Sequence, residues 1–192
     1  MKKSRIITYV VLATVVIFLI AVHGNIVDLK AAVETQYAQI QVNLQRRVDL
    51  LPNYLETVKA EMKHDEVIVS MIAEARAVGS KTLSATTNGN VNNAEEAIAN
   101  YDIAVDNYMN FISENYPELS AGQAFRDLRD ELVGAENRIS TSRKYYNEAV
   151  ERYNRYIGKF PGILIASIMN AEPAELFSAA EGSKIPPTMS FD

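Results

Sequence analysis

The feature that most restricts the fold is a run of 17 apolar residues without a charge, Ile6–Val22. A helix of this length just crosses about 30 Å of hydrocarbon, and Gly24–Val27 can add a turn. The rival interpretation is a cleaved signal peptide, but Val22-His23-Gly24 fits poorly with the small residues that precede a cleavage site. We therefore expect a basic amino terminus, residues 1–5, followed by a transmembrane anchor, residues 6–24.

The charges around this run predict the sidedness of the chain. Lys2, Lys3 and Arg5 precede the run without a compensating acid, whereas residues 25–34 contain one basic residue, Lys30. Positive residues beside a span stay in the cytoplasm. We therefore expect a single-pass protein of the inner (cell) membrane, with its amino terminus in the cytoplasm and the rest of the chain extracytoplasmic.

The composition excludes several functional classes. After the apolar run the chain has 16 basic and 24 acidic residues, so nucleic acid repels it. The absence of Cys excludes a disulfide scaffold, a thiol nucleophile and a Cys-ligated zinc ion. No phosphate-binding loop, nucleophile elbow or HExxH motif occurs. The adjacent residues His64, Asp65 and Glu66 point about 100° apart on a helix and cannot chelate together. We expect no enzyme activity, cofactor or metal site.

Hydrophobic residues then recur every three or four positions, which predicts one amphipathic helix that continues from the membrane to about Val78. The clearest part of this pattern is Tyr37–Glu66. Pro52 lacks an amide hydrogen and crowds the preceding turn, so we expect the helix to bend there. Gly79 is expected to end it, and residues 79–91, which are small and polar, to form an exposed loop.

Two further helices are expected before residue 162. Capping-box patterns predict that one begins at Asn92, with Glu95, and the next at Ser120, with Gln123. The last helix has a sevenfold repeat that is typical of a coiled-coil-like seam. Its positions are Phe125, Leu132, Ile139, Tyr146, Tyr153 and Phe160. The predicted fold is therefore all-α: a transmembrane helix that continues into an elongated antiparallel bundle of three to four helices, residues 25–162.

Residues 163–192 are expected to form a tail. Ile163–Met169 is apolar but too short to span a bilayer, so it must pack on the bundle, on another subunit or in the membrane interface. Ala171–Asp192 is acidic and contains Pro186-Pro187, which predicts a flexible segment.

A buried charge is predicted in the first long helix. Arg47 falls beside Leu44 and Leu51 of the hydrophobic stripe, where a cation must reach solvent or find a carboxylate partner. We expect Glu136, next to seam residue Ala135, to be this partner. Such a pair more often sets helix alignment than it catalyses a reaction.

A second polar pattern lies in the seam of the last helix, where Tyr146-Asn147 is followed one heptad later by Tyr153-Asn154. A tyrosine in a seam buries its ring and needs a partner for its hydroxyl group. Polar seam residues specify the alignment of helices, so we assign these residues a structural role. The complete set with this role is Arg46, Arg47, Asp49, Pro52, Glu136, Tyr146, Asn147, Tyr153 and Asn154.

Residues 44–66, LQRRVDLLPNYLETVKAEMKHDE, resemble the core motif of the LemA family: two Arg, an acid, then a hydrophobic-Pro-Asn step. Residues 115–132, NYPELSAGQAFRDLRDEL, and 135–154, AENRISTSRKYYNEAVERYN, agree with it in the same order. The chain departs at Val48, where an aromatic residue is common. The resemblance implies a bacterial single-pass membrane protein with an elongated helical domain. It carries no established catalytic residue or cofactor; some members serve magnetosome formation, and others are linked to membrane organisation or stress.

Two functions follow as hypotheses. The first is a non-enzymatic, membrane-anchored helical scaffold that assembles with itself or with other membrane proteins in membrane organisation or stress. The alternative is an extracytoplasmic sensor or ligand-binding bundle. An internal pocket lined by Arg46, Arg47 and Tyr146 would favour the sensor, and a filled core would favour the scaffold.

Overall fold

The structure is a computed structural model that describes residues 2–59, 66–87 and 89–178, with side chains from residue 6 onward. All regular structure in these residues is helical, which confirms the all-α prediction. The helices are α1 (Lys2–Lys59), α2 (Glu66–Thr87), α3 (Val91–Asn115), α4 (Pro117–Ser120), α5 (Gln123–Ile157) and α6 (Gly162–Met169).

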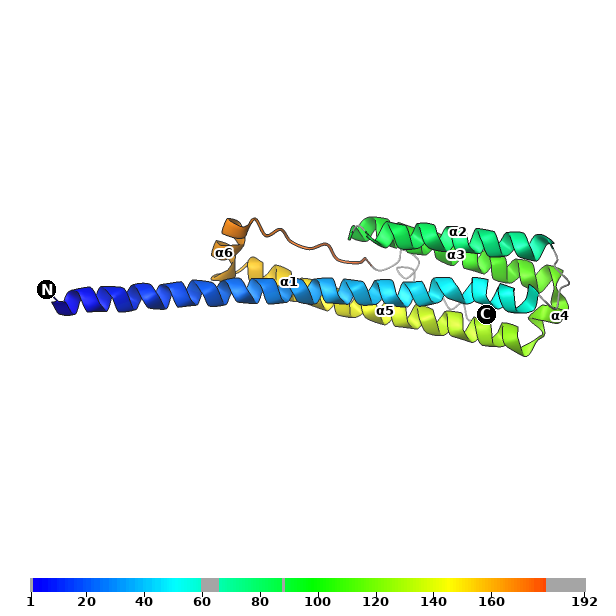
Figure 1. Ribbon diagram of the computed structural model, residues 1–192, viewed down its shortest axis with the longest axis horizontal. Helices are drawn as coiled ribbons and strands as arrows, with labels where there is room; N and C mark the ends of the chain where they lie inside the picture. The colour runs from blue at the N-terminus through cyan, green and yellow to red at the C-terminus, as the bar shows by residue number, and fades with distance from the viewer. Residues whose placement is uncertain (1, 60–65, 88, 179–192) are drawn as a thin grey trace, which may run out of the picture.

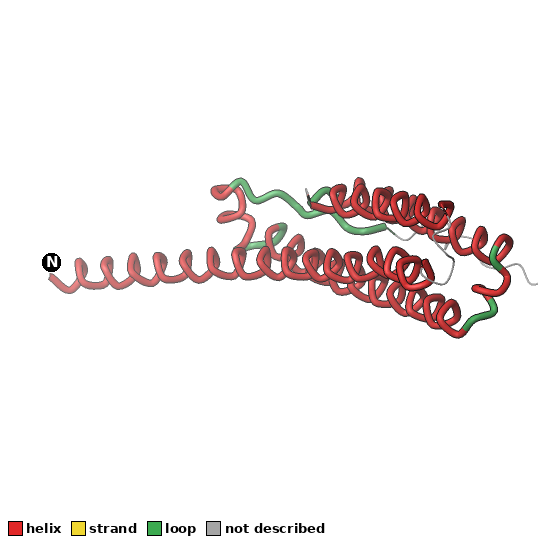
Figure 2. The backbone as a smooth tube through the Cα atoms, turned by 45° about the vertical axis from the view of Figure 1, so that its right-hand side comes forward, coloured by secondary structure: helices red, strands yellow, loops and turns green. Residues whose placement is uncertain are grey.

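Four of these helices form an elongated antiparallel bundle. α1 packs along both α2 and α5, α2 packs along α3, and the short helix α4 connects α3 to α5. The amino-terminal part of α1 extends well beyond the bundle in both views (Figures 1 and 2). The predicted antiparallel bundle is therefore confirmed.

Helix α1 connects the apolar run to the bundle without a break. It has 58 residues, which corresponds to about 87 Å at 1.5 Å per residue. Residues 6–21 are exposed on every side, and burial begins at Val22. Within the described chain, α1 is the one helix with the length and composition to cross a membrane.

The predicted extent of the first helix is wrong. α1 ends at Lys59, and α2 begins at Glu66 and packs back against α1. The hydrophobic period continues across this reversal because both helices bury one face in the same core, so periodicity alone cannot show it. The residues that join the helices, 60–65, lie outside the described part of the chain, and they include His64 and Asp65, for which no metal site is expected. α1 is continuous through Pro52, which is buried; the bend stays a prediction.

The loop predicted for residues 79–91 is also wrong, because α2 continues to Thr87. Gly79 is buried inside α2, and a Cβ atom placed on it would lie 2.2 Å from Cγ1 of Val48. The glycine therefore lets α2 approach α1 closely. Thr82 and Thr86 are buried on the same helix, and each satisfies its hydroxyl group by donating to a carbonyl of the preceding turn. The small and polar residues of this part of α2 therefore form a close contact between helices rather than an exposed loop.

Both predicted capping boxes are absent. The cap of α3 is Asn90, whose side-chain oxygen accepts a hydrogen bond from the Asn93 amide at 2.9 Å, while Glu95 binds Ser178 instead. α5 begins at Gln123 after Gly122, without a side-chain cap. A capping box is a local pattern, and tertiary contacts compete with it for the same side chains.

The core consists of two hydrophobic clusters. The one farther from the apolar run joins α1, α2, α3 and α5, and the nearer one joins α1, the start of α3 and α5 with α6 and the tail. The predicted seam positions of α5 are buried from Phe125 to Tyr153, whereas Phe160 is 75% exposed beyond the end of α5. The sevenfold burial pattern is thus confirmed within α5.

We expect Gly79→Ala to destabilise the bundle. Its methyl group would collide with the branched side chain of Val48, and overpacking costs about 1–3 kcal/mol, which exceeds the gain of about 1 kcal/mol from removing a helix glycine. Gly134→Ala is the matched control, because only the flexible end of Arg138 lies near it. Urea denaturation should show a loss for the first variant and a gain for the second. Equal gains would mean that α2 does not approach α1 this closely.

Candidate functional site

A charged cluster lies in the middle of the bundle, where α1, α3 and α5 meet. Arg47 of α1 is buried, and its Nη1 atom donates to Glu136 Oε2 of α5 at 2.5 Å and to the carboxylate of Asp102 on α3. The guanidinium group also lies over the Tyr101 ring, 5.6 Å from its centroid. The expected contact between Arg47 and Glu136 is therefore present, and the additional contact with Asp102 extends the cluster to a third helix.

The second carboxylate, Asp102, was missed by the sequence analysis, although a signal for it existed. Asp102 follows Tyr101 of the α3 stripe, just as Glu136 follows Ala135 of the α5 seam. A carboxylate that flanks a buried position can reach inward while it keeps some contact with water. The side chains of Asp102 and Glu136 are 37% and 41% exposed, respectively, so they bring negative charge to Arg47 without full desolvation.

The electrostatics of this cluster fit a structural role. Burial raises the pKa of the Asp102 carboxyl group, and nearby Glu136 raises it further, while Arg47 lowers it. Burial also raises the pKa of Tyr101, whose hydroxyl group donates to the Arg47 main-chain carbonyl at 3.2 Å. Arg47 is thus held by groups of this chain on its side-chain and main-chain atoms.

The neighbouring polar residues do not converge on a reactive centre. Asn43, one turn before Arg47, donates to the Ser142 hydroxyl group at 2.8 Å and adds a buried contact between α1 and α5. Arg46 is exposed, and Asp49 is exposed and accepts hydrogen bonds from Gln45. No group of three or more His, Cys, Asp or Glu side chains that could hold a metal ion occurs among the described residues.

The repeated Tyr-Asn pairs of α5 bind the segment that follows α6. Asn154 donates to the Ala174 carbonyl and accepts from the Ala174 amide, both at 2.8 Å. Asn147 does the same with Phe177, at 2.8 and 2.9 Å. The hydroxyl groups of Tyr153 and Tyr146 donate to the main-chain carbonyls of residues 172 and 175. Residues 171–178 are therefore bound to α5 by hydrogen bonds. Residues 179–192 of the predicted flexible tail lie outside the described part of the chain, and the flexibility stays a prediction.

The spacing of these contacts has a geometric reason. One heptad of an α-helix rises about 10.5 Å, and three extended residues span about 10 Å. Partners seven residues apart on α5 therefore meet partners three residues apart on the tail, which runs in the opposite direction. The tail sequence repeats with this period: Glu172-Pro173-Ala174 is followed by Glu175-Leu176-Phe177. The sevenfold spacing of the Tyr-Asn pairs and the threefold repeat of the tail together could have indicated that these pairs bind the tail.

The tail also contributes to the core. Phe177 is buried and contacts the rings of Tyr146 and Tyr37, with centroid distances of 5.3 and 6.3 Å. Burial raises the pKa of Tyr146 to about 12, so its hydroxyl group stays protonated and able to donate at neutral pH. Ser178 then bonds Glu95 of α3. The tail thus connects α1, α3 and α5.

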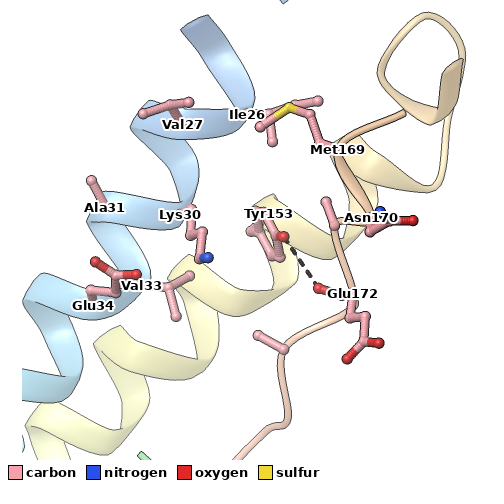
Figure 3. Close-up of a pocket in the computed structure, with 12 residues that line it drawn as sticks. Ile26, Val27, Lys30, Ala31, Val33, Glu34, Tyr153, Met169, Asn170 and Glu172 are labelled. Carbon is pink, nitrogen blue, oxygen red and sulfur yellow. Dashed lines mark hydrogen bonds between the residues drawn. The ribbon is translucent and has the colours of Figure 1, made fainter. Parts of the chain in front are cut away.

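A surface pocket of about 540 Å³ lies between the tail and the part of α1 that follows the apolar run. Figure 3 shows Lys30 and Glu34 on α1 at one side of it, and Met169 and Asn170 at the other, with Tyr153 between them. The pocket lies apart from the charged cluster. The internal pocket lined by Arg46, Arg47 and Tyr146 does not form, since Arg46 faces solvent, Arg47 binds carboxylates and Tyr146 packs on Phe177.

We expect Asn154→Asp to release the tail. The substitution places a carboxylate oxygen against the Ala174 carbonyl, where an amide now donates at 2.8 Å, and a lost buried hydrogen bond costs about 1–3 kcal/mol. Amide hydrogen exchange at Ala174 and Phe177 should accelerate by about tenfold or more. Asn137→Asp, an exposed site on the same helix, is the control and should leave both rates unchanged. Unchanged protection in Asn154→Asp would contradict the contact.

We expect Arg47→Met to lower the free energy of unfolding at pH 7 by about 3 kcal/mol. This is the lower end for a broken buried ion pair, because both carboxylates retain access to water. Since Arg47 lowers the pKa of Asp102, its removal raises that pKa further above the unfolded value. A carboxyl group with a raised folded pKa stabilises the fold when protonated, so this contribution is lost as pH rises through the folded pKa.

The pH dependence of Arg47→Met provides the check. Urea denaturation from about pH 4 upward should show its stability falling with pH relative to Arg47→Met/Asp102→Asn, which has no ionisable group at position 102. Parallel profiles of the single and double variants would mean that Arg47 does not control Asp102.

Comparison with known proteins agrees with this architecture. Two magnetosome proteins of Paramagnetospirillum magneticum (strain ATCC 700264 / AMB-1), MamQ 1 and MamQ 2, are each 32% identical to the chain over 75 residues. The aligned part covers 39% of this chain and 28% of each relative, so it spans little more than a quarter of their length. The model of the LemA family matches residues 36–191, which include the bundle, the charged cluster and the tail. This match covers most of the sequence, and the chain therefore belongs to the LemA family.

Proposed function

We propose that this chain is a non-enzymatic, membrane-anchored helical scaffold that assembles with itself or with other membrane proteins and acts in membrane organisation or stress. The observation that carries the proposal is the continuity of α1 from the candidate span into the bundle. A continuous helix fixes the position and orientation of the bundle relative to the span, whereas a flexible linker would let the two parts move independently. The bundle is thus a rod of fixed geometry relative to its anchor.

The interior of the bundle favours a scaffold function more than a ligand-binding function. Its largest enclosed side chains are aliphatic and close-packed, among them Leu44, Leu55, Ile98 and Ile139. The Nη1 atom of the buried cation Arg47 already binds two carboxylates of this chain, which fits a structural role. The names of the two relatives, both magnetosome proteins, fit a role in organising membranes.

The alternative is a ligand-binding bundle, and one observation favours it. The pocket of about 540 Å³ beside Lys30, Glu34 and Tyr153 has both charged and apolar walls, and it lies where the candidate span meets the bundle. A ligand bound there could link the tail to α1. Thermal shifts of the full chain with a metabolite collection, abolished by Lys30→Ala, would support this alternative over the scaffold.

Self-assembly is testable because the chain has no Cys. Ile103 on α3 and Val133 on α5 are 60% and 57% exposed, which makes them candidate contacts between copies. We expect oxidation in native membranes to crosslink Ile103→Cys or Val133→Cys into dimers. The control is Ala135→Cys, a buried neighbour that should stay monomeric. Monomers at both exposed positions, with single-step photobleaching of a labelled chain, would overturn self-assembly.

A further inference from the structure

An apolar surface remains uncovered at the end of the bundle that faces the candidate span. One side of α6 is buried, with Ile165 and Ala166 in the same cluster as Val22 and Ile26 of α1. The other large apolar side chains of α6 are exposed, and Ile168 has an exposed fraction of 77%. Phe160, which lies just before α6, has an exposed fraction of 75%. We call these residues the α6 patch: Phe160, Ile163, Leu164, Ile168 and Met169.

The height of this patch above the membrane follows from α1. Because α1 is continuous, each residue along it corresponds to a rise of about 1.5 Å. A span that begins at Ile6 crosses about 30 Å of hydrocarbon in about 20 residues and so ends near Ile26. α6 packs at Val22 and Ile26, beside the blue part of α1 in Figure 1 and nearer its amino-terminal end than its far end. The α6 patch therefore lies at the boundary between hydrocarbon and headgroups.

The adjacent surface is basic and aromatic. A groove of about 380 Å³ is lined by Arg152, Arg155 and Lys159 together with Leu29, Tyr156, Phe160 and Pro161. The headgroup layer adds about 5–8 Å, or about three to five residues of α1, so Leu29 and this groove lie within it. Asp28 and Lys30 of α1 lie in the same layer, and their opposite charges cancel. Arg155 forms an exposed ion pair with Glu151, with 2.9 Å between Nη2 and Oε1. An exposed ion pair of this kind contributes little free energy, so little opposes the replacement of Glu151 by a lipid phosphate as the partner of Arg155.

We propose that the α6 patch and the basic groove together form a lipid-binding surface that docks onto the anionic headgroups around the span. The apolar side chains enter the hydrocarbon boundary, while the three cations and the aromatic rings meet the headgroup layer. This arrangement is the one that interfacial segments use: apolar burial combined with electrostatic attraction to anionic lipid. The proposal rests on the membrane anchor of the proposed function but does not depend on self-assembly.

The absence of Trp from the chain gives a direct test. The full chain carrying Ile168→Trp is reconstituted in vesicles of phosphatidylcholine and phosphatidylglycerol, with lipids brominated at shallow or deep acyl positions. We expect a blue-shifted emission that the shallow bromines quench more than the deep ones. Phe18→Trp reports the span and should be quenched by the deep bromines, and Val133→Trp, exposed on the bundle, should not be quenched.

These reporters separate the possible failures. Quenching at Phe18→Trp with an unquenched, red emission at Ile168→Trp would overturn the docking and leave the anchor intact. A blue-shifted but unquenched Ile168→Trp would show that protein, for example a second copy, covers the patch, which also overturns the proposal. An unquenched Phe18→Trp would remove the anchor, and with it both the docking and the anchored scaffold.

The charge requirement is tested separately. In Ile168→Trp, the additional Arg155→Gln/Lys159→Gln should weaken docking in anionic vesicles by about fivefold for each lost cation, bringing quenching toward the level in phosphatidylcholine alone. Arg126→Gln/Arg129→Gln, at the far end of α5, is the matched control with the same charge change. Equal quenching in both double variants, or no dependence on phosphatidylglycerol, would overturn the role of the basic groove.

Discussion

The structure depends on the uninterrupted main-chain hydrogen bonding of α1. Inside a bilayer every amide and carbonyl group must be paired within the chain, so a helix is imposed on the apolar run. The same helix then continues as a wall of the bundle core, where Val22, Ile26, Ile40 and Leu44 lie on one buried stripe. Because rise and rotation are fixed along a helix, α1 fixes the positions of α5, α6 and the tail relative to the candidate span.

Hydrophobic seams alone leave the alignment of α1 and α5 weakly determined, since a shift of one heptad replaces one apolar contact by another. Polar contacts remove this freedom in both halves of the bundle. Far from the apolar run, Arg47 requires Glu136 and Asp102 at one height. Nearer to it, Asn147 and Asn154 require particular tail residues, and the tail in turn contacts α1 through Tyr37. A displaced helix would leave these groups buried and unpaired.

The helical class and the contact between Arg47 and Glu136 were predictable, because burial of one face leaves a period in the sequence and a buried cation requires a carboxylate. The errors arose where one local pattern allows two outcomes. Gly79 is as compatible with a helix end as with close helix packing, and only the distant Val48 decides. The reversal of chain direction between α1 and α2 leaves the hydrophobic period of the sequence unchanged. The tail carries no amphipathic pattern of its own, since Asn147 and Asn154 bind its main-chain atoms.

The charge distribution provides a last step toward the orientation of the rod. The chain beyond the apolar run has 24 acidic and 16 basic residues, so an anionic membrane repels the bundle as a whole. This repulsion is screened within about 8–10 Å in physiological salt, and it acts on the upper bundle only when the rod tilts toward the surface. The cations Arg152, Arg155 and Lys159 line a groove beside Leu29, within that distance of the end of the candidate span. In the proposed anchored arrangement, attraction at the base and repulsion along the rest of the bundle favour the same upright orientation, and self-assembly through the exposed sides of α3 and α5 would require neighbouring chains to share it.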